Sequence, residues 1–254
     1  MTRSAGDLVL MMQVLAGERF RQLGMGEDLD VGGLRVYYQT EATLSISAEP
    51  VHDCIKKAIL KSVEYLRDCG ATIMEEKFPE LEDSVDISVS LFFEMKDIPN
   101  MLQDPNDPKR TKSLFLEFLK LPFGGTTRTF QSLCFSLVQK TQLFIPEERR
   151  PVLKEKARKL TEKLVSRLST TGVLIYPVFS SPAPALGSLP ARSSGVMYSM
   201  LYNVIGACCS VVPAGEWQGM PVAVQIIAAP NQDRLCLAVA KILEKCFGGW
   251  KPPQ

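Results

Sequence analysis

The sequence of 254 residues predicts an α/β fold. Apolar stripes at helical spacing alternate with apolar runs of strand length, and glycines or prolines separate the two kinds of segment. Because the short runs have few polar residues, they are typical of strands buried on both sides. The pattern therefore predicts layers of helices around a largely buried sheet.

The first expected helix begins after Ser4, whose hydroxyl suits an N-cap, and Gly17 ends it. It is apolar almost all round, so it needs burial on several sides. Because it begins so close to Met1, we expect further structure to precede it and expect this chain alone to be aggregation-prone. The side chains expected to form an exposed apolar patch are Leu8, Leu10, Met11 and Leu15.

The next elements follow in the order strand, helix, strand. A strand is expected over 34–38, a helix with Pro50 in its first turn and Gly70 at its end, and a strand over 71–78. Residues 84–145 hold apolar islands between Pro- and Asp-rich turns. We interpret 84–145 as a variable, insertion-like region.

Clear helical order returns after this region. A leucine stripe predicts a helix whose basic residues, over 154–167, form a solvated face, with a membrane-surface role as the alternative. The remaining expected elements are a helix over 147–168, a strand over 173–178, a helix over 194–205, strands over 209–213 and 222–228, and a closing helix over 233–247.

Composition excludes several classes of function. A net charge of +1 indicates no nucleic-acid partner, and the single histidine, His52, excludes His-rich metal sites. His52 is expected to have a structural role near the start of its helix. Seven cysteines without a CxxC pair indicate reduced thiols in an intracellular protein. We expect no metal, no cofactor and no transmembrane segment, and no signal peptide at the start.

The most specific stretch covers residues 202–225. Its distinctive residues are Asn203, Gly206, Pro213, Gly215, Gly219, Pro221 and Gln225. Their spacing resembles the C-terminal signature of the amidase-signature serine hydrolases. Cys208 stands where the family usually has proline, and Ala223 where it usually has glycine. The opening helix and the ending, through Gly248-Gly249-Trp250, also resemble this family, the ending most of all the single-span fatty-acid amide hydrolases.

The resemblance implies that residues 1–254 are a partial amidase domain. They would be the C-terminal portion of the amidase-signature fold, a mixed sheet covered by helices, incomplete at its N-terminal side. The family's catalytic lysine and two serines lie before the matched region, so no catalytic residue is assigned. The resemblance also implies that Val196 and Met200, four residues apart, bind substrate as part of the acyl-channel wall; ordinary core packing is the alternative.

Three functional hypotheses remain open. The first is the C-terminal half of a serine amidase that hydrolyses long-chain fatty-acid amides in the complete enzyme and is inactive alone. The second is a non-catalytic lipid-binding or interaction module, and the third is an amidase that uses another serine. Residues 114–144 belong either to the core or to a peripheral membrane contact. The location would be cytoplasmic or membrane-associated, and the oligomeric state stays open.

Two motifs are interpreted as ordinary loops. The Ser-Ser-Gly of residues 193–195 lacks the preceding glycines of a nucleophile loop, so we expect a loop and a helix N-cap. The glycine turn of residues 121–127 lacks the strand and helix that a phosphate-binding loop needs.

Overall fold

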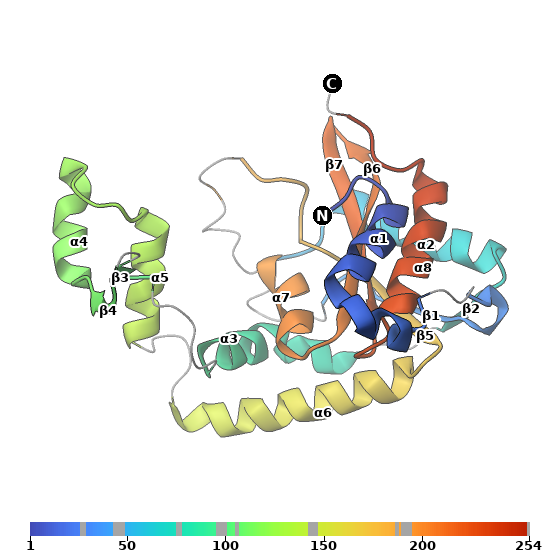
Figure 1. Cartoon of the computed structure of the whole chain (residues 1–254), viewed down its shortest axis with the longest axis horizontal. Coiled ribbons are helices and arrows are strands. Elements are labelled where there is room, and N and C mark those ends of the chain that lie inside the picture. Colours follow the sequence, from blue (N-terminus) through green and yellow to red (C-terminus); the bar gives the residue numbers. More distant parts are fainter. Residues whose placement is uncertain are drawn as a thin grey trace. The chain divides into compact units, whose positions relative to one another are not determined.

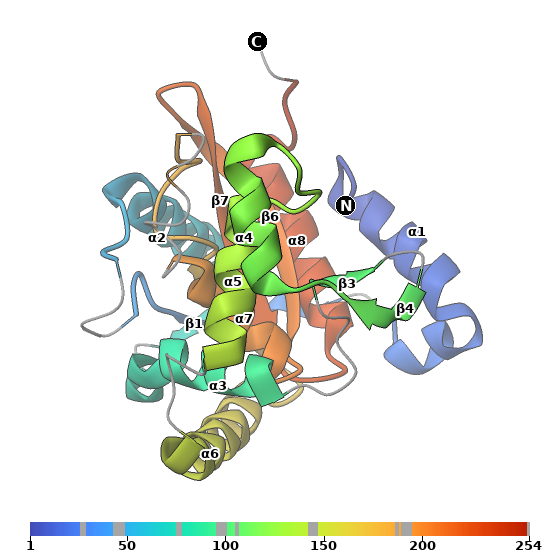
Figure 2. The same cartoon turned by 90° about the vertical axis from the view of Figure 1, so that its left-hand side faces the viewer.

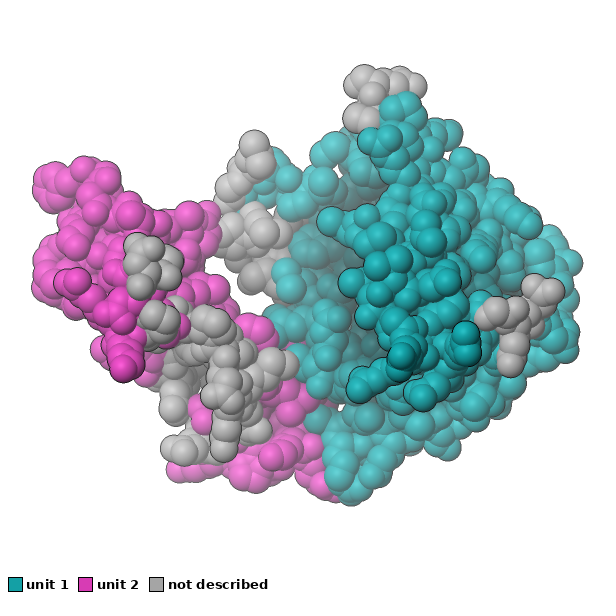
Figure 3. All heavy atoms as spheres, in the orientation of Figure 1, with its two compact units in different colours: residues 1–85, 156–254 teal, residues 86–155 magenta. Residues whose placement is uncertain are grey.

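The computed structural model describes residues 1–25, 29–42, 49–74, 78–94, 101–104, 107–141, 147–185, 188 and 195–252. They divide into unit 1, residues 1–85 and 156–254, and unit 2, residues 86–155 (Figure 3). Unit 1 holds a five-stranded mixed sheet of order β2-β1-β5-β7-β6. Helices cover this sheet, so the expected α/β fold is confirmed (Figure 1).

Strand direction changes within the sheet. The strands are β1 (Arg35–Tyr38), β2 (Thr72–Met74), β5 (Gly172–Pro177), β6 (Cys208–Trp217) and β7 (Met220–Ala228). β1 pairs in parallel with β2 and β5, whereas β7 pairs antiparallel with β5 and β6. All six residues of β5 are buried. The centre of the sheet is therefore the core of unit 1, as the apolar runs predict.

A tight hairpin joins β6 to β7. Trp217 pairs with Met220, which leaves the two-residue loop Gln218-Gly219. Both loop residues have positive φ, 50° and 75°. This is the backbone of a type I′ turn, which matches the twist of the flanking strands. The pairing makes β6 longer than the expected strand over 209–213.

Two helices lie on one face of the sheet and two on the other. α2 (Asp53–Asp68) and α8 (Asp233–Phe247) pack together and against β5, β6 and β7. α7 (Met197–Val204) packs on the opposite face. The Tyr37 hydroxyl on that same face donates to the carbonyl of Arg167, 3.3 Å away, in α6 (Arg150–Leu168). The apolar stripes of α2 and α6 are buried, and the basic face of α6 is largely exposed.

Helix α1 (Ala5–Ala16) packs against α8 and forms the outside of that layer (Figure 1). The Ser4 hydroxyl accepts from the Asp7 N–H at 3.1 Å, which confirms the expected N-cap. The exposed fraction is 60% for Leu10 and 77% for Leu15, and Met11 is also exposed, whereas Leu8 is half-buried. Most of the expected apolar patch is therefore present.

Unit 2 has a small core of its own. Its elements are most of α3 (Ser84–Glu94), β3 (Gln103–Asp104), β4 (Asp107–Thr111), α4 (Leu114–Lys120) and α5 (Phe130–Thr141). Leu102, Leu114 and Leu133 are buried together, and α4 packs against α5 (Figure 2). The unit overlaps the region 84–145 that we interpret as variable.

Several element boundaries differ from the expectations. α2 begins at Asp53 rather than near Pro50, because the imidazole of His52 provides its N-cap. α6 begins at Arg150, and the expected helix over 194–205 is helical over 197–204. Part of the expected strand over 71–78 lies outside the described residues. Short 3-10 helices cover Gly17–Leu23, Val31–Gly33, Pro79–Asp83, Leu121–Phe123 and Glu147–Arg149.

Across the described residues, no helix combines the length and apolar character that crossing a bilayer requires.

Candidate substrate-contacting site

The end of α7 accounts for the Asn-x-x-Gly spacing. Gly206 has φ +73°, and the next N–H, of Ala207, donates to the Tyr202 carbonyl at 3.0 Å. Glycine adopts this left-handed conformation without a Cβ penalty, so it ends the helix and directs the chain into β6. The Asn203 side chain donates to the Ser199 carbonyl at 3.3 Å. The motif therefore fixes where α7 stops.

Tyrosines attach α7 to the sheet. Tyr198, Leu201 and Tyr202 are buried on the side that faces β5. The Tyr176 ring on β5 lies 5.5 Å from the Tyr198 ring and 5.7 Å from the Tyr202 ring, measured between centroids. Burial raises the pKa of Tyr176 and of Tyr202 well above the usual range. These phenols stay neutral and act as packing groups rather than as bases.

Gln225 links α7 to two strands. Its side-chain amide is buried and donates to the Pro177 carbonyl at 2.8 Å and to the Tyr198 carbonyl at 2.6 Å. Gln225 lies opposite Tyr176 on one side and opposite Val211 on the other. The amide therefore joins a carbonyl at the end of β5 to a carbonyl in α7. The sequence motif includes Gln225 but predicts no contact for its side chain. Only folding brings Gln225 next to α7.

Close packing also fixes the start of α7. A Cβ on Gly195 would lie 2.7 Å from the Phe179 ring and 2.8 Å from the Ser180 hydroxyl oxygen. Atoms at such distances overlap, so no other residue fits without movement. Gly195 therefore lies directly against Phe179 and Ser180 in the loop that follows β5.

Val196 and Met200 lie on the side of α7 away from the sheet. Val196 has helical dihedral angles immediately before α7 and an exposed fraction of 38%, and Met200 is half-buried. Their spacing of four residues places them on one face, opposite Tyr198 and Tyr202. That position is compatible with an apolar wall that a ligand contacts. Their assignment as substrate-binding residues stays a prediction.

A polar cluster supports the loop after β5. The fully buried Ser180 hydroxyl donates to the Glu49 carboxylate at 2.9 Å, and the Ser180 carbonyl accepts from the His52 N–H at 2.7 Å. The Tyr198 hydroxyl donates to the Glu49 carbonyl at 3.5 Å. A nucleophilic serine needs a base and access for a carbonyl carbon. Ser180 is closed to substrate, so the cluster positions the loop and α7.

His52 has a structural role in this region. Its Nδ1 accepts from the Cys54 N–H at 3.2 Å, and its ring lies 4.5 Å from the Trp217 ring between centroids. The contact joins the tip of the β6–β7 hairpin to the start of α2. Both features agree with the expected structural role.

The remaining motifs are the Ser-Ser-Gly of residues 193–195 and the glycine turn of residues 121–127. Ser193 and Ser194 lie outside the described residues. In the glycine turn, Gly124 has φ +66° and ends a 3-10 helix, and its N–H donates to the Leu121 carbonyl at 3.2 Å. Within the described part of the chain, no group of three His, Cys, Asp or Glu side chains is placed to hold a metal ion.

Comparisons with known proteins agree on one family. The sequence profile described as Amidase matches residues 1–237. The fatty-acid amide hydrolase 2-A of Danio rerio is 27% identical over 271 residues, and the fatty-acid amide hydrolase 2 of Homo sapiens is 26% identical over 259 residues. Both alignments cover 100% of this chain and 48% of the relative. The chain thus spans about half the length of these relatives.

Solved structures show the same fold. A 6-aminohexanoate cyclic dimer hydrolase complexed with substrate superposes with a TM-score of 0.66 at 18% identity, covering 100% of this chain and 55% of that chain. A fatty acid amide hydrolase superposes with a TM-score of 0.61 at 14% identity, covering 98% of this chain and 47% of that chain.

Proposed function

The chain belongs to the Amidase family, and from this premise we propose that it supplies the acyl-chain-binding part of a hydrolase of long-chain fatty-acid amides. Two relatives that match over the whole chain are named as fatty-acid amide hydrolases. The observation that carries the proposal is the arrangement of α7. Gln225 and the tyrosines fix the helix to the sheet, while Val196 and Met200 face away from it.

We propose that these 254 residues are inactive alone. In the family, one serine forms and breaks the bond to the acyl group while a second serine and a lysine transfer protons, and none of the three has a match in this sequence. The Ser180 hydroxyl, bound to Glu49 and fully buried, offers no replacement. The chain would hold the acyl group while a complementary half of the fold supplies the nucleophile. Its seven free cysteines support an intracellular setting for such an enzyme.

The acyl-wall assignment is tested at Met200. In an enzyme completed with the N-terminal half of the Danio rerio relative, Met200→Trp would fill the proposed channel. We expect kcat/KM for a long-chain amide to fall at least about tenfold more than kcat/KM for a short-chain amide, which corresponds to about 1.4 kcal/mol. The control is Leu60→Trp, at an exposed leucine on α2. Equal losses for both substrates would place Met200 in the core and remove the assignment.

A second candidate function is supported by unit 2, which exposes an apolar face on α4. The α4 apolar face comprises Phe115, Leu116 and Leu119 of α4 together with Phe123 of the 3-10 helix that follows it, and Phe123 is 88% exposed. Lysines lie beside it in the sequence, Lys112 before α4 and Lys120 at its end. A short apolar face next to cations is typical of segments that bind a lipid surface. We therefore propose that unit 2 makes the peripheral membrane contact.

Vesicle binding tests this second function. The double variant Leu119→Ser with Phe123→Ser removes two exposed apolar side chains without changing charge. We expect the affinity for anionic vesicles to fall about tenfold or more, since each large apolar side chain contributes about 1.5–3 kcal/mol when it is fully buried. The matched control is Leu60→Ser on α2, exposed to 49%. Equal affinity for the double variant and the unchanged chain would exclude the α4 apolar face as the contact.

A further inference from the structure

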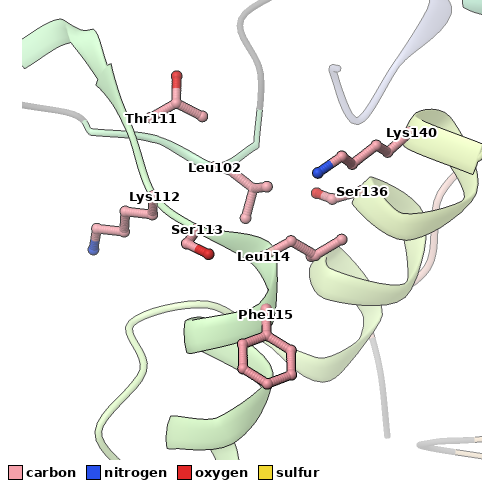
Figure 4. Close-up of a pocket in the computed structure, with 8 residues that line it drawn as sticks. All are labelled: Leu102, Thr111, Lys112, Ser113, Leu114, Phe115, Ser136 and Lys140. Carbon is pink, nitrogen blue, oxygen red and sulfur yellow. The ribbon is translucent and has the colours of Figure 1, made fainter.

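Unit 2 contains a cavity of about 400 Å³ between the β4–α4 connection and α5 (Figure 4). This volume lies within the range of small-molecule sites, roughly 300–1,000 Å³. The cavity adjoins the small core of unit 2, because Leu102 and Leu114 belong to both. It involves no residue of α7.

The lining is apolar in one part and cationic in another. Leu102, Leu114 and Phe115 provide carbon surface, and Phe115 is largely exposed. On α5, Ser136 and Lys140 lie one helical turn apart and both line the cavity. Figure 4 shows the Lys140 ammonium next to the Ser136 hydroxyl and directed toward Leu102. The Ser136 side chain is buried and donates to the Ser132 carbonyl at 2.8 Å.

The charge of Lys140 is not balanced locally. Among the described residues, no carboxylate lies within ion-pair distance of its ammonium, and none of the residues lining the cavity is acidic. The second lysine of the lining, Lys112, donates to the Thr127 hydroxyl at 3.0 Å. The nearby Glu117 carboxylate accepts from Thr126 at 2.6 Å and from Lys120 at 3.0 Å. Lys140 is therefore the cation left for a ligand.

We propose that this cavity binds a long-chain carboxylate, with the carboxylate on Lys140 and the alkyl chain against Leu102, Leu114 and Phe115. A charged hydrogen bond from the ammonium to the carboxylate is the strong polar contact available here. The Ser136 hydroxyl donates its one proton to the Ser132 carbonyl, so the ammonium of Lys140 is the donor for the carboxylate. The alkyl chain would continue from Phe115 along the rest of the α4 apolar face. An anionic lipid headgroup has the same charge and is the other source of such a ligand.

Calorimetric titration of the full chain with decanoate below its micellar concentration tests the proposal. Acetate has the carboxylate without the chain, and decyltrimethylammonium has the chain with the opposite charge. We expect decanoate to bind and both comparison ligands to bind at least about tenfold more weakly. Anionic vesicles form a separate arm of the experiment. Comparing binding to vesicles with binding to decanoate shows whether the ligand is a free carboxylate or a bilayer headgroup.

The variant Lys140→Gln should weaken decanoate binding about tenfold, as expected when a hydrogen bond between charged groups is lost. Lys109→Gln removes the same charge from an exposed site in unit 2 outside the cavity lining, so it should change binding by less than about twofold. Lys140→Glu, which reverses the charge, should abolish binding. Lys140 is exposed, so none of these changes removes buried packing.

Three results would overturn the proposal. They are undetectable decanoate binding by the unchanged chain, equal effects of Lys140→Gln and Lys109→Gln, and an effect of Lys140→Gln confined to vesicles. The last result would identify the ligand as a bilayer headgroup. Because the titration requires no turnover, its outcome is independent of the proposed amide hydrolysis.

Discussion

The buried amide of Gln225 connects a sequence motif to the placement of α7. In Gln225→Met, side-chain volume is nearly conserved but the Pro177 and Tyr198 carbonyls lose their donor. Tyr198 lies inside α7, so its carbonyl also serves the backbone ladder of the helix. The change therefore removes two hydrogen bonds at about 0.5–1.5 kcal/mol each, and we expect the free energy of unfolding to fall by about 1–3 kcal/mol. Chemical denaturation measures this loss. Gln131→Met, at an exposed position on α5, is the control and should change stability by less than about 0.5 kcal/mol.

Cys208 gives a pH-dependent prediction. Burial and a hydrogen bond to the Asp233 carboxylate at 3.3 Å raise the pKa of its thiol from 9.0 to about 11. The folded chain therefore keeps a proton that the unfolded chain releases near pH 9. Its contribution to stability is complete below pH 9 and is lost as pH rises to about 11. We expect the Tm of the unchanged chain to fall between pH 9 and pH 11. The Tm of Cys208→Ala should fall less over the same pH range.

The control for this titration is Cys69→Ala, because Cys69 is exposed. The fall in Tm should be the same in Cys69→Ala as in the unchanged chain. A Cys208→Ala variant whose Tm falls as steeply as that of the unchanged chain would show that other groups cause the alkaline loss.

Among the elements, α1 exposes an apolar face to solvent. Val14 and Leu15 are 71% and 77% exposed on the side away from α8. Replacing both with lysine should reduce aggregation and leave Tm within about 2 °C, because no buried contact is removed. Light scattering during heating measures this change. Ala5→Lys is the contrasting variant and should lower Tm, since Ala5 is buried. Unchanged aggregation of the double variant would assign the aggregation to another surface.

The start of α7 depends on the absence of a side chain. Gly195→Ala would place a methyl group against Phe179 and Ser180, so we expect a loss of about 1–3 kcal/mol from overpacking. Gly6→Ala is the control, because a Cβ there makes one ordinary contact, at 3.7 Å from the Ser4 hydroxyl oxygen. If Gly195→Ala is as stable as the unchanged chain, Phe179 and Ser180 can move to make room for the methyl group, and close packing does not fix the start of α7.

Across the whole molecule, the sequence predicts best those helices and strands whose bounds depend on neighbouring residues. It predicts contacts between distant segments less well. Helix α8 matches its expected bounds because its apolar stripe and Gly248 are both local. Helix α2 begins later than the sequence predicts because its cap is the imidazole of His52, a residue with little preference for that role. The roles of Gln225 and Ser180 depend on the order of the strands in the sheet. The spacing of apolar residues along the sequence does not predict that order. The cavity of unit 2 likewise needs three segments that are brought together only by folding.

We propose that these residues hold the acyl chain of an amidase whose nucleophile lies in another part of the fold. The most direct test treats purified residues 1–254 with a fluorophosphonate, which labels activated serines, and measures hydrolysis of a long-chain fatty-acid amide. We predict no labelling and no hydrolysis by the chain alone, and both once the N-terminal half of the amidase fold is supplied. Labelling and turnover by residues 1–254 alone would contradict the claim and would identify a catalytic serine within this chain.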